Sequence, residues 1–126
     1  MSEQGNGAIV WRDLTVRDAG AIRDFYTHVI GWTARDHAMG DYADFDILDE
    51  NGNCVAGICH ARGANADIPP VWLTYVQVAD VAAAAERCVE KGGRLHAGPR
   101  AMGGSLFCVI EDPAGAMLGL IGPSAE

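Results

Sequence analysis

The sequence lacks any long hydrophobic run, and this absence bears on where the protein works. No apolar stretch approaches the roughly 20 residues that a membrane-spanning helix needs. The first residues, Met-Ser-Glu-Gln-Gly, have neither the basic start nor the apolar stretch of a signal peptide. We therefore expect a cytoplasmic protein with no membrane partner.

Positive charge is also scarce. Nine Lys and Arg residues stand against 17 Asp and Glu, so the formal net charge is −8 at pH 7. Such an excess of carboxylates repels phosphate backbones and anionic lipid instead of attracting them. Nucleic acid is therefore not an expected partner.

The four cysteines form no Cys-x-x-Cys pair, and each one has apolar neighbours in the sequence. Pairing them would require an oxidising compartment, to which nothing in the sequence directs the chain. The pattern therefore predicts buried free thiols, at Cys54, Cys59, Cys88 and Cys108.

The common nucleophile and phosphate motifs are missing as well. The chain has no Gly-x-Ser-x-Gly, no Gly-x-x-x-x-Gly-Lys and no His-Glu-x-x-His. Gly103-Gly104-Ser105 precedes an expected strand and not a helix, so it does not predict a phosphate site.

The composition that is present suits one ordinary globular domain covering residues 1–126. The chain has 49% hydrophobic and 21% charged residues over its 126 positions. At this length about two-thirds of the unfolded surface is buried on folding, which is enough without disulfides or a structural metal.

The period of the hydrophobic residues changes along the first half of the chain in the order strand, helix, strand, strand, strand. Asp18 is the expected N-cap of the helix and Gly31 its end. The helix's expected apolar face is Ala19, Ile22, Phe25, Tyr26, Val29 and Ile30. The expected strands are Ala8 to Val16, Trp32 to His37, Tyr42 to Leu48 and Cys54 to His60.

After a loop from Ala61 to Pro70 the same order begins again. Asp80 is the second expected N-cap, and Gly92-Gly93 ends a helix whose apolar face is Val81, Ala84, Ala85, Cys88 and Val89. The expected strands are Val71 to Val78, Arg94 to Pro99, Leu106 to Glu111 and Ala116 to Ile121.

Corresponding positions of the two halves can be counted. Val16 and Val78, Asp18 and Asp80, and Gly31 and Gly93 are each 62 residues apart, whereas the turn residues Asp49 and Asp112 are 63 apart. We therefore predict an α+β fold of tandem β-α-β-β-β units that form a curled mixed sheet, with repeat 1 at about 8–60 and repeat 2 at about 71–122.

Three stretches carry a family resemblance that covers roughly Ile9 to Pro123. They are Trp11-Arg12-Asp13-Leu14-Thr15-Val16-Arg17-Asp18, then Phe25-Tyr26 with Val29-Ile30-Gly31-Trp32, and Glu111-Asp112-Pro113-Ala114-Gly115. The chain thereby resembles the vicinal-oxygen-chelate superfamily, which includes glyoxalase I, bleomycin-resistance proteins, fosfomycin-resistance enzymes and extradiol dioxygenases.

The resemblance implies a cup with a metal site built from the first and last strand of each unit. The family's ligand positions fall on Trp11, Ala56, Leu73 and Gly119 in this sequence. None of these side chains can bind a metal, because zinc, iron, nickel and manganese sites need His, Cys, Asp or Glu donors. We therefore expect no metal and no cofactor, and neither glyoxalase I nor extradiol dioxygenase activity.

Alternation along the strands predicts which side chains line the cup. If Trp11 faces the cup, Asp13 and Thr15 do too, and Leu14 and Val16 lie under the helices. The same parity places further residues on the cup side, namely Leu73, Tyr75, Gln77, Cys54, Ala56, Ile58, His60, Met117, Gly119 and Ile121. We predict a small-molecule site of unknown ligand, with Trp11, Asp13, His60, Leu73, Tyr75 and Met117 as ligand-binding residues.

Purely structural roles are also possible for the same residues. Trp11 could fill the space that a metal vacates, Asp13 could pair with an arginine, and His60 could be a solvated histidine. The strand from Tyr42 to Leu48 carries Asp44 and Asp46 on one face, which is typical of the wetted face of an antiparallel strand.

The sequence is compatible with three functions. The first is a metal-free binding protein of the bleomycin-resistance kind. The second is a metal-independent lyase or isomerase that uses Asp13, Tyr75 or His60 as acid and base. The third is a metalloenzyme with displaced ligands such as Cys54, His60 and Asp13.

Many members of the family complete their cups by pairing two chains, so the resemblance also implies a homodimer with twofold symmetry. The edges of the first strands and the apolar end of the long loop, Ile68-Pro69-Pro70-Val71-Trp72, are the expected contact regions.

Overall fold

A computed structural model describes residues 5–124 of the chain, which divide into two compact units. Arg12–Trp72 form what we call the N-terminal unit. The residues up to Trp11 and those from Leu73 onward form the C-terminal unit. Each unit has its own helix, strands and core.

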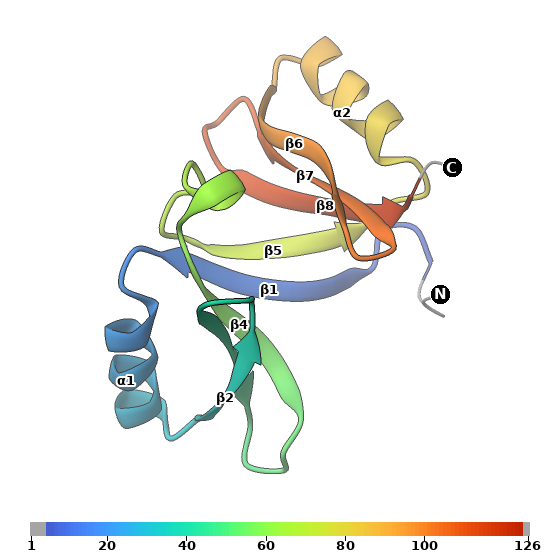
Figure 1. Cartoon of the computed structure of the whole chain (residues 1–126). Coiled ribbons are helices and arrows are strands. Elements are labelled where there is room, and N and C mark those ends of the chain that lie inside the picture. Colours follow the sequence, from blue (N-terminus) through green and yellow to red (C-terminus); the bar gives the residue numbers. More distant parts are fainter. Residues whose placement is uncertain (1–4, 125–126) are drawn as a thin grey trace. The chain divides into compact units, whose positions relative to one another are not determined.

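The N-terminal unit holds most of β1 (Ile9–Val16), followed by α1 (Ala19–Ile30), β2 (Thr33–Ala38), β3 (Ala43–Leu48) and β4 (Cys54–His60) (Figure 1). Its strands lie in the hydrogen-bonded order β2-β3-β4-β1. β1 runs parallel to β4, and the other pairs are antiparallel. A short 3-10 helix, η1 (Gly63–Asn65), follows β4.

Local chemistry explains where α1 begins and ends. The Asp18 carboxylate accepts a hydrogen bond from the Ala21 backbone N–H at 3.2 Å, as an N-cap does. At the other end Gly31 adopts a left-handed conformation with φ 90°, which glycine reaches without strain. Both predicted boundaries are confirmed.

The predicted apolar face of α1 is wrong in part. Ala19 is buried and Ile22 and Tyr26 pack against the core, but Phe25 and Val29 are 55% and 59% exposed. Ile30 is exposed as well. Only one narrow side of the helix contacts the strands. Apolar residues next to that side, such as Phe25 and Val29, remain exposed to solvent.

The C-terminal unit repeats the same order. It contains all of β5 (Trp72–Gln77) except Trp72, followed by α2 (Val81–Glu90), β6 (Arg94–Met102), β7 (Ser105–Glu111) and β8 (Met117–Pro123). Its strands lie in the order β5-β8-β7-β6. β5 and β8 are parallel, and β8, β7 and β6 are antiparallel neighbours. α2 packs on β6, β7 and β8, and its N-cap is Asp80, as predicted.

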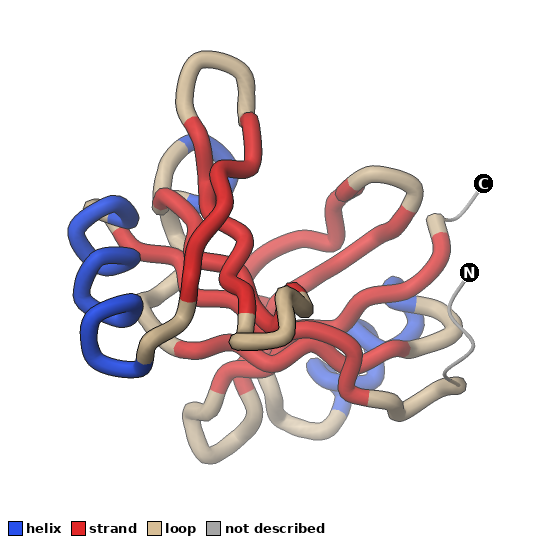
Figure 2. Tube along the Cα trace, turned by 90° about the horizontal axis from the view of Figure 1, so that it is seen from below, coloured by secondary structure: helices blue, strands red, loops and turns tan. Residues whose placement is uncertain are grey.

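Much of the trace in Figure 2 is strand. The N-terminal unit contains the α-helix α1 and the C-terminal unit contains α2. The α+β class and the duplicated β-α-β-β-β order are therefore confirmed. One boundary differs clearly, because β6 continues to Met102 and does not end at Pro99.

Matching turns support the duplication. The Asp49 carboxylate accepts hydrogen bonds from the backbone N–H groups of Asn51 and Asn53, and Asp112 does the same for Ala114 and Ala116. The bond from Asn53 is the main reason that the pKa of Asp49 is lowered.

All four cysteines are free thiols, but they are not all buried. Cys108 is buried, Cys59 and Cys88 are half-buried, and Cys54 is exposed. The prediction of burial is therefore wrong for Cys54, which begins β4 at the end of a turn. Within residues 5–124, no helix is long and apolar enough to cross a membrane.

Candidate functional site

The face of the C-terminal unit that points away from α2 is apolar. Leu73, Tyr75, Phe107 and Val109 are buried there, and Trp11, Ala97, Met117 and Ile121 pack against them. We call these eight residues the apolar face. They alternate along the strands with the residues under α2, such as Cys108 and Leu120, which form a separate core.

An open pocket of about 900 Å³ adjoins the apolar face. Trp11 and Ile121 belong to both, so the pocket wall continues into the face. The other lining residues are Asn6, Val10, Gln77, Ala79, Gly104, Ser105, Gly122 and Pro123. The volume lies in the range of small-molecule sites, and a hydrophobic lining with few polar groups is typical of them.

Four of the predicted ligand-binding residues therefore lie together. Trp11, Leu73, Tyr75 and Met117 all belong to the apolar face, although Leu73 and Tyr75 are almost fully buried in it. Phe107 and Val109 belong to the same face and were missed. The alternation of Leu106 to Glu111 would have placed them there.

The positions at which the family's metal ligands fall do not fit a metal. Trp11 and Leu73 offer no donor atom, and Gly119 has no side chain. A Cβ atom on Gly119 would stand only 2.5 Å from Cδ2 of Tyr75, so the tyrosine ring occupies the space that a ligand side chain would need.

The fourth position is Gly57 and not Ala56. Tyr75 pairs with Gly119 in the C-terminal unit, and Asp13, 62 residues before Tyr75, pairs with Gly57. A bulge opposite Ile47 and Leu48 inserts one residue near the start of β4, so counting from the turn is wrong by one. Glycine at position 57 offers no donor either.

Because of this bulge, the predicted lining of the cup is wrong for two residues of β4. Ile58 pairs with Leu14, and both pack with Ala19 of α1, so Ala56 and Ile58 lie on the helix side of the N-terminal unit. The prediction that they face the cup is wrong, because a shift of one residue moves every side chain to the opposite face.

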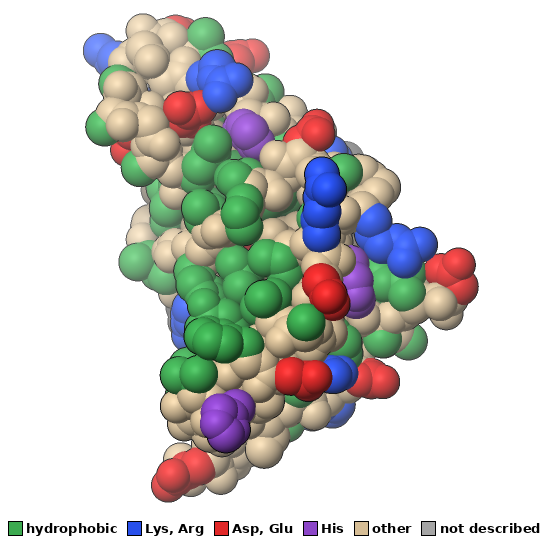
Figure 3. Space-filling view, turned by 90° about the vertical axis from the view of Figure 1, so that its left-hand side faces the viewer, with side chains coloured by type: hydrophobic (Ala, Val, Ile, Leu, Met, Phe, Trp, Pro, Cys, Tyr) green, Lys and Arg blue, Asp and Glu red, His purple; other side chains and the backbone are tan. Residues whose placement is uncertain are grey.

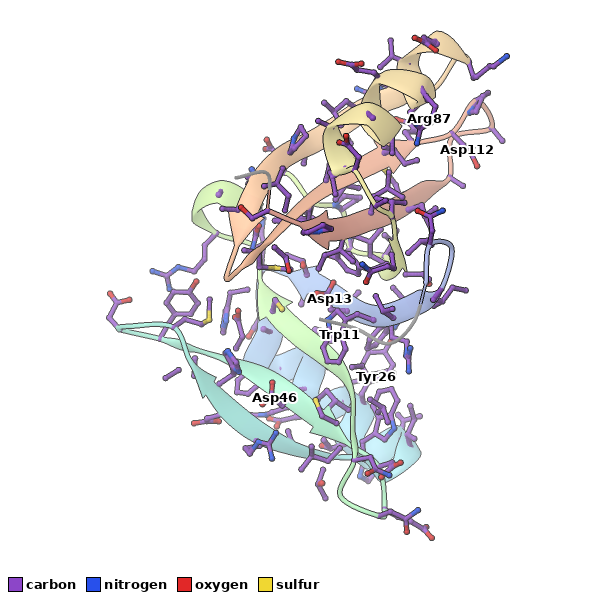
Figure 4. The ribbon with its side chains drawn as sticks, turned by 90° about the vertical axis from the view of Figure 1, so that its right-hand side faces the viewer. Trp11, Asp13, Tyr26, Asp46, Arg87 and Asp112 are labelled. Atoms are coloured by element: carbon purple, nitrogen blue, oxygen red, sulfur yellow. The ribbon has the colours of Figure 1, made fainter. Side chains whose placement is uncertain are left out.

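Carboxylates gather on the other face of the N-terminal unit, around the Cys59 thiol. Burial and the neighbouring charges of Asp13, Asp44 and Asp46 raise the pKa of this thiol well above its ordinary value. We call Asp13, Asp44, Asp46 and Cys59 the acidic face. Asp13 projects from β1 two residues after Trp11 (Figure 4).

Asp44 is buried, which corrects the prediction of a wetted strand face. Its Oδ1 atom accepts a hydrogen bond from the His60 backbone N–H at 2.9 Å and lies 3.1 Å from His60 Nδ1. The His60 ring also packs edge-on against Tyr42. His60 is therefore held in a fixed orientation.

Asp46 has partners of a different kind. Arg35 donates to its Oδ2 at 3.1 Å, and His37 Nδ1 lies 3.3 Å from Oδ1. Both partners are largely exposed, so this cluster lies at the rim of the acidic face.

Within the described residues, 5–124, no group of three or more His, Cys, Asp or Glu side chains could hold a metal ion. The displaced set of Cys54, His60 and Asp13 is therefore not brought together as a metal site.

Comparison with known proteins gives the same family from sequence. Residues 8–120 match the model of the Glyoxalase/Bleomycin resistance protein/Dioxygenase superfamily. "Putative glyoxylase CFP32" of Mycobacterium tuberculosis is 34% identical over 94% of this chain. The "Anthracycline biosynthesis protein DnrV" of Streptomyces peucetius is 31% identical over 92% of it. The chain spans about half the length of these curated relatives, 47% in each case.

Solved structures share the fold at low identity. The methylmalonyl-CoA epimerase of Mycobacterium tuberculosis matches with a TM-score of 0.58 and 15% identity, over 99% of this chain and 94% of that one. The Streptomyces coelicolor methylmalonyl-CoA epimerase in complex with 2-nitronate-propionyl-CoA matches with a TM-score of 0.56 and 17% identity, over 96% and 100%. With the family model covering most of the chain, this protein belongs to the Glyoxalase/Bleomycin resistance protein/Dioxygenase superfamily.

Proposed function

We propose that this protein binds a small organic molecule on the apolar face of its C-terminal unit, without a metal. The observation that carries the proposal is that Trp11 and Ile121 belong both to the apolar face and to the wall of the pocket of about 900 Å³. An aromatic side chain at the edge of a pocket supplies a flat surface for stacking. The four positions onto which the family's metal ligands fall hold no metal-binding side chain, so apolar contact and shape supply most of the binding.

Fluorescence of N-phenyl-1-naphthylamine tests the proposal, because this neutral aromatic probe brightens when it leaves water. We expect saturable binding to the wild type and at least a fivefold loss of affinity in Trp11→Ala, since an aromatic contact contributes about 1 kcal/mol or more. Trp72→Ala is the matched control, because the Trp72 ring packs against Tyr26 and Trp32 and not on the apolar face. Equal affinity of the Trp11 variant and the wild type would contradict the assignment of the site.

A second candidate function is acid-base catalysis by His60. The supporting observation is the buried Asp44 carboxylate, which accepts from the backbone and lies against Nδ1 of the same residue. A carboxylate at Nδ1 favours the tautomer that carries its proton there and leaves Nε2 as a proton acceptor. This is the arrangement that a general base requires.

Nitrogen NMR of the imidazole tests this second candidate without a substrate. We expect neutral His60 to be protonated at Nδ1 in the wild type and to lose that preference in Asp44→Ala. Asp46→Ala is the control, because Asp46 contacts His37 and not His60. Protonation at Nε2 in the wild type would rule out His60 as the base.

We further propose that the protein is a cytoplasmic homodimer. Hydrophobic side chains reach the surface in the view of Figure 3. The exposed large hydrophobic side chains of the N-terminal unit include Phe25, Val29, Ile30, Val71 and Trp72. Exposed apolar groups of this kind are typical of contact surfaces. Native mass spectrometry should give twice the chain mass, with or without an organic adduct, and a bare monomer at high micromolar concentration would contradict the proposal.

A further inference from the structure

Arg100 occupies a defined place beside the proposed ligand site. It pairs with Phe107 on the neighbouring strand, Phe107 pairs with Ile121, and Ile121 pairs with Gln77. Paired residues share a face of the sheet, so these four side chains form one row across the C-terminal unit. Gln77 and Ile121 at one end of the row line the pocket, and Arg100 stands at the other end.

A backbone irregularity turns Arg100 toward the apolar face. The register of β6 against β7 shifts between Ala97 and Arg100, whose partners Val109 and Phe107 both belong to that face. In a regular strand, residues three apart would point to opposite faces. Gly98 makes the shift possible, because its φ is +79° and a Cβ atom there would stand only 2.7 Å from the Phe107 carbonyl oxygen.

The guanidinium of Arg100 lies over an aromatic ring, and two of its nitrogens lack a hydrogen-bond partner among the described residues. Its Cζ is 5.4 Å from the centre of the Phe107 ring. Nε and Nη2 are buried, and neither has a hydrogen-bond partner among residues 5–124. Because a guanidinium stays charged at all relevant pH values, buried N–H groups of this kind call for an acceptor.

The other arginine of β6 shows the ordinary arrangement. Arg94 is 67% exposed and forms an ion pair with the Glu111 carboxylate. Nε and Nη2 of Arg100 have no hydrogen-bonded carboxylate within the part of the chain that the structure describes. The two arginines on one strand therefore differ in both burial and pairing.

We propose that Arg100 is the anion-recognition residue of the ligand site, so that the natural ligand is an amphipathic organic acid. Its apolar body would lie over Ile121 and Phe107, and its carboxylate would accept paired hydrogen bonds from Nε and Nη2. Two strand spacings separate Ile121 from Arg100, so the body spans roughly 10 Å. The inference rests on the proposed binding function and adds the chemical class of the ligand.

The negative net charge of the chain further restricts which anions can bind. At a net charge of −8, the protein as a whole repels small free anions. A single arginine beside an apolar surface therefore favours acids that also carry an apolar body over inorganic anions.

A matched acid and amide test the proposal. Biphenyl-4-carboxylate and the neutral biphenyl-4-carboxamide are each used to displace N-phenyl-1-naphthylamine from the protein. We expect the wild type to bind the acid at least about tenfold more tightly than the amide, because a guanidinium forms stronger hydrogen bonds with a carboxylate than with a neutral amide. Arg100→Met should reduce this ratio to below about twofold, each displacement being compared with the variant's own affinity for the neutral probe.

Arg94→Met is the control, because it removes the same charge from the same strand. It should keep the preference for the acid, and Arg100→Lys, which keeps the charge without the fork, should keep part of it. Equal binding of acid and amide to the wild type would overturn the proposal even if Arg100→Met did not fold. Equal losses in the Arg94 and Arg100 variants would overturn it too, since overall charge would then explain the effect.

Failure of the proposed function has a different signature. If N-phenyl-1-naphthylamine does not bind the wild type at all, there is no apolar site, and the inference falls with it. If the probe binds but the acid has no advantage, the apolar site stands and only the role of Arg100 is wrong.

Discussion

Gly119 lies directly beneath the ring of Tyr75 on the neighbouring parallel strand. A Cβ atom at position 119 would stand 2.5 Å from Cδ2 and 2.7 Å from Cε2 of that ring. The two residues therefore depend on each other, because the buried tyrosine can lie flat only where its neighbour has no side chain. The contact also explains why a metal-ligand position of the family's fold is closed here.

Gly119→Ala should destabilise the protein by about 1–3 kcal/mol, because the tyrosine ring must move within a packed core. Urea denaturation of the variant measures this. In the background of Tyr75→Leu, which removes the ring, the same glycine substitution should cost clearly less. Strictly additive losses in the double variant would show that the clash is not the cause.

Gly98→Ala should also destabilise, by about 1–3 kcal/mol, since the position has positive φ and no room for a Cβ. The variant should in addition lose preference for the biphenyl acid, because the shift that turns Arg100 inward depends on this residue. Gly20→Ala is the control, as a Cβ there would meet nothing within 4 Å and the residue lies in α1 of the N-terminal unit. Thermal unfolding and probe displacement give the two readouts.

Asp44→Ala should lower stability by about 1–3 kcal/mol, because it leaves the partly buried His60 N–H without its acceptor. Asp44→Asn should lose less, since the amide oxygen can still accept that bond. Asp46→Ala, whose partners are exposed, should change stability by less than about 1 kcal/mol. An equal loss in Asp44→Ala and Asp46→Ala would contradict the distinction between buried and rim carboxylates.

The cysteines should differ widely in reactivity at pH 8. Burial raises the pKa of Cys108 to about 11, so its thiolate fraction at pH 8 is on the order of one in a thousand. The pKa of Cys59 is raised as well, by burial and by Asp13 and Asp44. We expect a disulfide reagent followed by mass mapping to label exposed Cys54 first, and faster labelling of Cys59 or Cys108 would contradict it.

The same shifts have a consequence for stability. A raised thiol pKa means that the folded state prefers the protonated form, so this contribution is complete below the ordinary value of 9.0. It is lost as the pH rises from 9.0 toward about 11. Denaturation midpoints should fall over this interval more in the wild type than in Cys108→Ala, and parallel curves would exclude the effect.

Much of the fold could be predicted from the sequence, because the signals are local. Asp18 and Asp80 begin helices by capping their first N–H groups, and Gly31 ends the first one. Alternation along single strands correctly grouped Trp11, Tyr75 and Met117, which all reach the apolar face. Such patterns need only the immediate neighbours of each residue.

What the sequence by itself determined is thus the duplicated element order, the family and the lack of metal-binding side chains at three of the four positions onto which the family's ligands fall. Only the tertiary structure decided that Gly57 and not Ala56 is the fourth of these positions, that Asp44 is buried and that Arg100 faces the apolar side. The physical reason is that each of these depends on a bulge or on a partner from another strand. Because side chains alternate with a period of two, one extra residue reverses a face without leaving a mark in composition or periodicity.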